Sequence, residues 1–386
     1  MPYLYKAKTM SEFLPVFEFS FGTYLFLCFC LFSFIQLLFL ILVYSRLAFH
    51  KDKSLKTNTP PVTIIIAARN EADNLFKNLP FILDQDYPNY EVIVVNHQSM
   101  DESKYILDAF AHEFPNIRVI NVERSQHMKF GKKLPLTLGI KGAKYEHLLF
   151  TDADCNPASN QWLKSMSSHF SEKHEIVLGY GPYKKKKGFL NKVIRFDTAW
   201  IAMNYFSFAK AKLPYMGIGR NMAYTKSVFN AVSGFKSHYA LSSGDDDLFI
   251  QEAAKKGNYT INLDPDSFCY SNPPKSWSSW MRQKSRHYTT TERYKVIKKL
   301  LLGIYPLTLL LMLFSFVTLL FDSNFIWLTL TIFGFILAVK WVVMGRALVK
   351  LGETKYIAYL PLLDIAYAVL APTMYYSIDK RDKNKW

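Results

Sequence analysis

The chain has 386 residues, half of them apolar, and a formal net charge of +16. This composition excludes a chain that is disordered as a whole and leaves room for one or two domains with a sizeable core or a membrane part. Basic residues lie beside apolar runs and in YKKKKGF, residues 183–189, which indicates a membrane surface and argues against nucleic acid as the partner. For YKKKKGF itself a solvated turn is an equal alternative.

Four apolar stretches are long enough to concern a membrane. After an N-terminal segment, 1–18, residues 19–45 exceed the roughly 20 residues that span a bilayer core and have no cleavage site behind them, so they predict a retained transmembrane helix. A C-terminal transmembrane region is expected over 300–377, with runs at about 300–321, 325–343 and 356–377. Lys340 can carry its charge to the interface along its stem. The last run contains Asp364, so it spans as a kinked helix, lies partly in the interface or sets Asp364 against a protein partner.

Basic residues determine the predicted orientation. The basic linker 46–60 outweighs the lysines before the first span, which places the middle of the chain in the cytoplasm. We therefore expect a multi-pass protein of the cytoplasmic (inner) membrane whose remaining domain faces the cytoplasm. Four spans would put the basic tail, 378–386, outside, so either the fourth run does not fully cross or the charge rule fails there.

Strands and helices alternate along residues 61–272. VTIIIAARNE, YEVIVVNHQS, IRVINV and HLLFTDAD read as strands that end in polar loops, with helices at about 72–83, 103–114 and within 131–143. This order predicts an α/β fold with a mostly parallel sheet and helices on both faces, and such sheets bind ligands beyond the carboxyl ends of their strands. The polar residues at those ends are Arg69, Asn70, Glu71, Asn96, His97, Asp152 and Asp154.

The pair Asp152 and Asp154 closes the fourth strand. Two carboxylates separated by one residue offer hard oxygen ligands for Mg²⁺ or Mn²⁺ carrying a diphosphate. Taken alone the pair is weak evidence, because many such pairs cap loops or face solvent.

Several motifs in fixed order resemble the family 2 inverting glycosyltransferases of the membrane-anchored bacterial type, which have a GT-A fold. The resemblance covers about residues 61–287 and is carried by VTIIIAARNEADNL, DQDYPNYEVIVVNHQSMDES, TDAD, GIGRNMAY, GDDDLFIQEAAKKG and RQKSRH. It implies an enzyme that uses a UDP- or GDP-sugar donor, a divalent cation (Mn²⁺ or Mg²⁺) held by Asp152 and Asp154, and a carboxylate base.

Three consecutive aspartates compete for the role of base. The resemblance places the base at the start of a helix that ends in a basic pair and Gly257, which favours Asp246, with Asp245 second. Asp247 is more simply explained as a carboxylate at a helix N-terminus.

The nucleotide-sugar site implied by the resemblance departs from the family pattern at two points. Asn96 and His97 stand where relatives commonly have two aspartates, so the usual uracil contact is not implied. His287 replaces the tryptophan that follows Gln283 and Arg286 in the family motif, although those two residues still share a helix face suited to a diphosphate. Simple docking of these basic residues on lipid is the alternative. The full expected donor set is Ala68, Arg69, Asn70, Glu71, Asn96, His97, Lys132, Asp152, Ala153, Gln283, Arg286 and His287. Lys132 and Lys133 either approach phosphate or are ordinary solvent-facing lysines, and the second interpretation is slightly favoured.

Two further segments complete the predicted site. The resemblance implies that GIGRNM supplies four acceptor-side residues, Gly217, Gly219, Arg220 and Asn221. Its small glycines would let backbone approach a ligand, and a tight turn is the alternative. Residues 273–299 predict an amphipathic helix in the membrane interface.

These features predict a membrane-bound, metal-dependent inverting glycosyltransferase whose acceptor is a lipid or a lipid-linked sugar at the cytoplasmic leaflet. A processive polysaccharide synthase is the second hypothesis. A catalytically inactive membrane scaffold with the same fold is the third.

Overall fold

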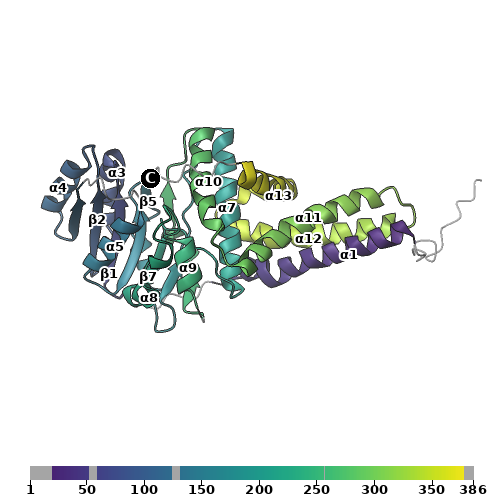
Figure 1. Ribbon diagram of the computed structural model, residues 1–386, viewed down its shortest axis with the longest axis horizontal. Coiled ribbons are helices and arrows are strands. Elements are labelled where there is room, and N and C mark those ends of the chain that lie inside the picture. Colours follow the sequence, from purple (N-terminus) through teal and green to yellow (C-terminus); the bar gives the residue numbers. More distant parts are fainter. Residues whose placement is uncertain (1–19, 52–58, 124–130, 256, 378–386) are drawn as a thin grey trace, which may run out of the picture. The chain divides into compact units, whose positions relative to one another are not determined.

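The computed structural model describes residues 20–51, 59–123, 131–255 and 257–377, and the chain separates into two compact units (Figure 1). We call residues 50–295, 350–353 and 377–386 the sheet unit, and residues 1–49, 296–349 and 354–376 the helical unit. The expectations for 1–18, for residues 52–58 of the basic linker and for 378–386 lie outside the described residues.

The sheet unit is built on a seven-stranded sheet with the order β3-β2-β1-β4-β7-β6-β8. All strand pairs are parallel except those that β7 makes with β4 and β6, so the predicted mostly parallel α/β sheet is confirmed. A separate two-stranded sheet joins β5 and β9. The strands are β1 (Val62–Ala68), β2 (Tyr90–His97), β3 (Ile117–Val122), β4 (His147–Asp152), β5 (Cys155–Pro157), β6 (Ile176–Leu178), β7 (Met222–Thr225), β8 (Tyr259–Ile261) and β9 (Cys269–Ser271).

Eight helices belong to the described part of the sheet unit. They are α3 (Ala72–Leu83), α4 (Ser103–Glu113), α5 (Lys133–Gly142), α6 (Trp162–Ser167), α7 (Phe189–Lys210), α8 (Lys226–Ala231), α9 (Asp247–Ala253) and α10 (Trp277–Thr291). The first three match the helices expected from the sequence to within a few residues.

Helices cover both faces of the sheet because β1 alternates its buried side chains between them. Ile64 and Ile66 pack in one core with Leu75 of α3 and Trp162 of α6. On the opposite face α5 approaches so closely that a Cβ on Gly139 would lie 2.7 Å from a methyl group of Ile65. All seven residues of β1 are buried, as a β-branched parallel strand requires.

The helix expected over 273–299 is shorter in the structure. It begins at Trp277, because Ser276 and Ser279 form a capping box at its N-terminus, and it ends at Thr291. A new helix, α11, starts at Val296, ahead of the expected position 300.

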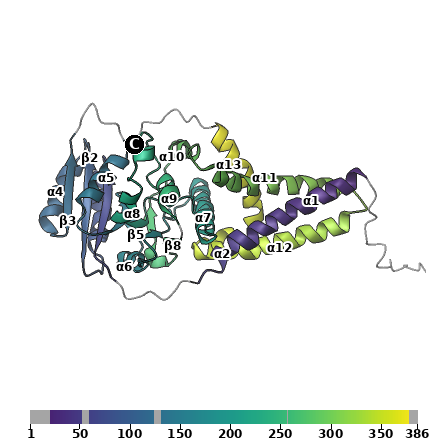
Figure 2. The same ribbon diagram turned by 60° about the horizontal axis from the view of Figure 1, so that its bottom comes forward.

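The helical unit packs α1 (Phe21–Leu38), α11 (Val296–Leu319) and α12 (Ile326–Lys350) side by side around an apolar core that includes Phe29, Leu309 and Ile336 (Figure 2). Beyond α1 the chain continues through a π-helical stretch, Phe39–Tyr44, and α2 (Ser45–Ala48). By length and hydropathy three of its helices can cross a membrane: Phe21–Ala48, Val296–Leu319 and Ile326–Lys350. The expectation of one N-terminal and two or three C-terminal spans is therefore met with two at the C-terminus.

The fourth apolar run forms α13 (Leu360–Ser377), which is not among the three candidate spans within the described residues. Its Asp364 is 1% exposed, accepts a hydrogen bond from the Tyr305 hydroxyl at 3.0 Å and forms an ion pair with Lys340. Lys340 is itself only 4% exposed. Its stem therefore turns inward to neutralise Asp364 and does not carry its charge to an interface.

Candidate active site

The carboxyl ends of three neighbouring strands meet at one edge of the sheet. The register pairs Ala68 at the end of β1 with Asn96 of β2, and Ala67 with Asp152 of β4. The polar residues predicted after these strands, from Arg69 to Glu71, Asn96 and His97, and Asp152 to Asp154, therefore lie along the same edge, as parallel pairing requires.

The loop after β1 is held by the loop after β2. Asn70 has a φ of 54°, and this turn is fixed by its N–H, which donates to the Ser99 hydroxyl at 2.9 Å. The Ala72 N–H at the start of α3 donates to the Asp101 carboxylate at 3.0 Å. Ser99 and Asp101 were not singled out from the sequence, although they belong to the same polar loop as Asn96.

Glu71 lies close to the aspartate pair. Burial, together with the nearby carboxylates of Asp154 and Asp152, raises its pKa to about 7, although a hydrogen bond from Asn74 opposes the shift. Removing a side chain from water and placing it beside like charges both disfavour the ionised form. This part of the edge therefore carries more carboxylates than it can stably ionise without a cation.

Unsatisfied amides line the end of β2. Asn96 donates to the Asn121 side chain at 2.9 Å, but its own carbonyl oxygen has no hydrogen-bond partner in the described part of the chain. In the same described part of the chain, neither polar atom of the Gln98 side chain has a hydrogen-bond partner. Both residues are buried, with Gln98 4% exposed and Asn96 5% exposed. A buried amide without a partner costs folding free energy, so these groups are candidates for contact with a ligand. Sequence reasoning found Asn96 but missed Gln98.

His97 stands between them and is fully buried. Burial lowers the pKa of its imidazole, and the charge of Arg69 lowers it further, so the ring is neutral at pH 7. A neutral imidazole offers one donor and one acceptor and adds no charge to the edge.

The pair predicted to hold a metal is part of a compact donor group. One ligand atom each from Asp152, Asp154 and Cys155 lies within 4.8 Å of the others. Burial raises the pKa of Asp154, and the charge of Asp152 adds to this. The Cys155 thiol donates to Asp154 at 3.3 Å and is the member that the sequence did not predict. Ala153 between the aspartates is buried, and its carbonyl accepts a hydrogen bond from Asn78 of α3 at 3.0 Å, which fixes the loop.

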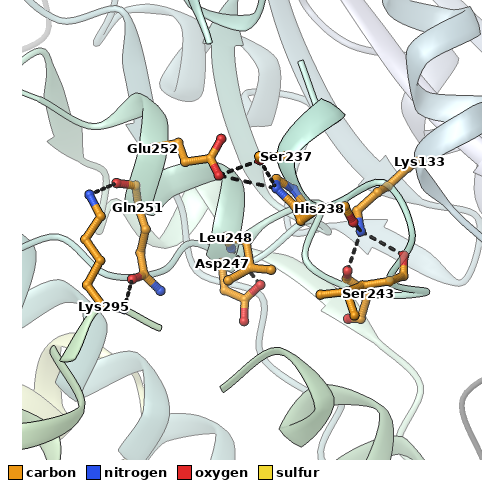
Figure 3. A network of polar contacts seen from close by, with 10 residues as sticks. Lys133, Ser237, His238, Ser243, Asp247, Leu248, Gln251, Glu252 and Lys295 are labelled. Carbon is orange, nitrogen blue, oxygen red and sulfur yellow. Dashed lines mark hydrogen bonds and ion pairs between the residues drawn. The ribbon is translucent and has the colours of Figure 1, made fainter. Parts of the chain in front are cut away.

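Two lysines at the start of α5 join this group to the loop before α9. Lys132 forms an ion pair with Asp152 and lies 3.9 Å from the Asp245 carboxylate. Lys133 donates to the carbonyl oxygens of His238, Leu241 and Ser243 at 2.7, 2.8 and 2.6 Å (Figure 3). Lys133 is 3% exposed, so neither residue is an ordinary solvent-facing lysine.

The three aspartates before α9 have different environments. Asp246 is the N-cap, and its carboxylate accepts from the Gly219 N–H at 3.1 Å and from the Asp247 N–H at 2.8 Å. Burial, followed by the charges of Asp245 and Asp247, raises the pKa of Asp246 to about 7. Asp247 instead accepts hydrogen bonds from Thr290 and from the Tyr294 hydroxyl, the latter at 2.8 Å, so it ties α9 to the end of α10 and the residues that follow it.

The predicted acceptor-side residues divide into two groups. A Cβ at Gly219 would lie 3.4 Å from Asp245 and 3.6 Å from Asp246, so this glycine borders the carboxylates. Gly217, by contrast, packs against apolar side chains. Asn221 accepts from the Trp162 indole at 3.0 Å and donates to two backbone carbonyls, which commits its amide to the fold.

Arg220 and α10 form the remaining side of the site. The Arg220 guanidinium lies 4.5 Å over the Tyr183 ring and donates to the Gly181 carbonyl. The Tyr183 hydroxyl in turn accepts from Gln283 of α10 at 2.8 Å. His287 keeps solvent contact, yet the surrounding protein and then the charges of Arg286, Lys284, Arg220 and Lys132 lower its pKa, so its ring is neutral near these cations.

This edge thus carries the elements of a nucleotide-dependent group transfer: a carboxylate pair suited to a cation, a raised-pKa carboxylate and unsatisfied amides. Residues 63–232 match the family model Glycosyl transferase family 2. The chain belongs to glycosyltransferase family 2 and has the GT-A fold of that class of enzyme.

Three similar proteins illustrate the relationship. The glycosyltransferase AglE of Haloferax volcanii is 30% identical over 54% of this chain and 66% of its own length. A beta-monoglucosyldiacylglycerol synthase of Nostoc is 32% identical over 30% of this chain and 24% of its own length. A mannosyltransferase from Pyrobaculum calidifontis, solved with GDP-Man and Mn²⁺, shares the fold with a TM-score of 0.53 at 19% identity, over 86% of this chain and 99% of its own. The chain therefore spans from about a quarter to about two thirds of these curated relatives.

Proposed function

We propose that this chain is a membrane-bound, metal-dependent inverting glycosyltransferase that moves a sugar from a nucleotide-sugar donor to a lipid or lipid-linked acceptor at the cytoplasmic leaflet. The observation that carries the proposal is the position of Lys132, which pairs with Asp152 and lies 3.9 Å from Asp245. One ammonium group thereby brings the carboxylates after β4 and those before α9 into a single site.

The residues after β4 suit a divalent cation. Asp152 and Asp154 provide adjacent carboxylate oxygens, the ligand type that Mg²⁺ and Mn²⁺ prefer. Burial and the charge of Asp152 raise the pKa of Asp154, which a bound divalent cation would offset. A divalent cation bound there neutralises the negative charge that develops on the leaving diphosphate. The Mn²⁺ in the Pyrobaculum mannosyltransferase structure supports this assignment.

Asp246 is the proposed base. The acceptor hydroxyl gives its proton to the Asp246 carboxylate while its oxygen forms a bond to the anomeric carbon, and the bond from that carbon to the nucleotide diphosphate breaks on the opposite side. A base works best when its pKa lies near the working pH, and the Asp246 pKa of about 7 meets that condition. The Gly219 N–H, which donates to the carboxylate, fixes its orientation.

The donor is proposed to lie across the ends of β1 and β2. Asn96 and Gln98 present unsatisfied amide groups of the kind that pair with the polar edge of a nucleobase. Lys132, Arg220 and Arg286 supply positive charge for a diphosphate, and arginine binds phosphate oxygens through two parallel N–H groups. The GDP-Man in the Pyrobaculum structure supports a nucleotide-sugar as the donor.

Lipid is the proposed acceptor class because the chain carries three helices apolar enough to span a membrane. The Nostoc relative, named a beta-monoglucosyldiacylglycerol synthase, supports the same choice. A processive synthase would use the same site and differ in the length of its product.

The test uses the purified full chain in detergent or vesicles with a panel of UDP- and GDP-sugars, with Mn²⁺, Mg²⁺ or chelator, and with or without membrane lipid extract. We expect nucleotide release that needs the metal, rises with lipid and yields a product extended by one sugar. Long polymers from the purified protein would overturn the acceptor assignment. No release from any donor with either metal would favour an inactive scaffold.

A further inference from the structure

A second surface of the sheet unit has no role in the proposed reaction. Residues Lys184 to Lys187 form a loop ahead of α7, and the last three of these lysines are exposed. Phe189, which opens α7, is 72% exposed, and Trp277, which opens α10, is 48% exposed. We call Lys184–Lys187, Phe189 and Trp277 the lysine–aromatic surface.

The loop is held in place by its backbone. The Lys184 N–H donates to the Ser271 carbonyl at 2.9 Å, and the Lys186 N–H donates to the Asn191 side chain at 2.8 Å. Asn191 also returns a hydrogen bond to the Lys184 carbonyl at 3.2 Å. Gly188, with a φ of 107°, then allows the turn into α7. The lysine side chains therefore project from a defined loop.

The two aromatic residues come together although they are distant in sequence. The ring centroids of Phe189 and Trp277 are 6.3 Å apart, and Trp277 lies 5.7 Å from the buried Trp280 in a T-shaped contact. Trp280 thus anchors the pair from inside while Phe189 and Trp277 present apolar area outward. An exposed pair of large aromatic rings beside cations is the arrangement that amphipathic membrane-binding segments use.

The chain segments that carry this pair are rich in basic residues. Residues 183–196 and 268–291, the segments that carry the surface, contain no acidic residue. Among the described residues none of Lys184 to Lys187 takes part in an ion pair. The lysines therefore keep their full charge for an external anion.

We infer that the lysine–aromatic surface docks the sheet unit on an anionic lipid bilayer, with Lys184–Lys187 at the headgroups and the Phe189 and Trp277 rings in the interfacial layer. The surface also belongs to a part of the chain that leads into a candidate span, because only residues 292–295 connect α10, which Trp277 opens, to α11. This docking is independent of the transfer reaction, so it stands or fails separately from the proposed function.

Charge sets the expected size of the effect. Each lysine near an anionic membrane surface strengthens association by about fivefold. Four lysines therefore favour the docked state by a factor on the order of several hundred. The attraction is screened by salt, since the Debye length falls from about 10 Å at 0.1 M to about 3 Å at 1 M ionic strength. Docking should therefore depend on both the lipid headgroup and the salt concentration.

The experiment measures hydrogen exchange in the full chain reconstituted in bilayers of phosphatidylcholine alone or of an equimolar mixture with phosphatidylglycerol. We expect exchange in 184–191 and 275–282 to slow in the anionic bilayer, and the slowing to disappear at high salt. The variant with all four residues Lys184–Lys187 changed to Gln should lose this response. The control changes four exposed lysines elsewhere on the sheet unit, Lys104, Lys141, Lys164 and Lys173, to Gln and should keep it.

A second measurement identifies the partner directly. Replacing Phe189 with the photocrosslinker benzoylphenylalanine should yield crosslinks to lipid in the anionic bilayer. Equal exchange on both bilayers, an equal loss in the control variant, or crosslinks to protein in place of lipid would each overturn the inference. Apart from the half-buried Lys184, both quadruple variants change only exposed side chains, so their melting temperatures should match that of the unaltered chain, and this comparison verifies that they fold.

Discussion

The role proposed for Asp246 is most directly tested by changing it to Asn. Asparagine keeps the size of the side chain, but its single carbonyl oxygen can accept from only one of the two N–H groups, those of Gly219 and Asp247, that the two carboxylate oxygens of Asp246 contact at 3.1 and 2.8 Å. It cannot take up the acceptor proton. Loss of a general base lowers turnover by about 10²- to 10⁴-fold, while binding of the donor should be unchanged. Nucleotide release measures the first effect, and calorimetric titration with donor and Mn²⁺ measures the second.

The pH dependence of turnover by the unaltered enzyme tests the same role independently. With a pKa of about 7, roughly a tenth of the Asp246 carboxyl groups are ionised at pH 6, about half at pH 7 and about nine tenths at pH 8. Turnover should thus rise about fivefold from pH 6 to pH 7 and less than twofold from pH 7 to pH 8. A flat profile over this range, or near-normal turnover by Asp246→Asn, would refute the assignment.

The pH dependence of the unfolding temperature provides a third test of Asp246. The pKa of Asp246 is raised in the folded chain, so folding disfavours its ionised form, and this cost grows as the pH rises from about 4 to about 7. Asn carries no such cost but loses one of the two hydrogen bonds from Gly219 and Asp247, so the unfolding temperature of Asp246→Asn relative to that of the unaltered chain should be higher at pH 8 than at pH 5. Asp247→Asn is the matched control: it disturbs the contacts with Thr290 and Tyr294 and should lower the unfolding temperature.

Three further predictions follow from the same edge of the sheet. Changing Asp152 and Asp154 to Asn should weaken Mn²⁺ binding, measured by electron paramagnetic resonance of free Mn²⁺, and undiminished binding would remove the metal from this site. Lys133→Met leaves three carbonyl oxygens without their donor and should lower the free energy of unfolding by about 1–3 kcal/mol, whereas Lys141→Met, on the exposed side of α5, should not. Gln98→Ala should narrow the difference in KM between UDP- and GDP-sugars, and an unchanged ratio would exclude Gln98 from contact with the nucleobase.

Local sequence determined the first four strands, the helices between them and the candidate spans. Val62 to Ala68 is an uninterrupted apolar run rich in β-branched residues, and such a run is stable only as a strand buried on both faces, which is how β1 lies. Alternation with helices then implies parallel pairing, and parallel pairing brings the ends of β1, β2 and β4 together. These steps depend on short-range periodicity and on chain order, so no coordinates were needed to place Glu71, Asn96 and Asp152 at one edge.

Only the tertiary structure decided which partners the long lysine side chains contact. Lys132 and Lys133 are adjacent and identical in type, yet one pairs with Asp152 and the other binds three carbonyls more than 100 residues away. Lys340 likewise turns to Asp364 on another helix. A lysine stem reaches in several directions at similar cost, and its choice is settled by the position of distant partners. That position is a property of packing, which sequence periodicity does not encode.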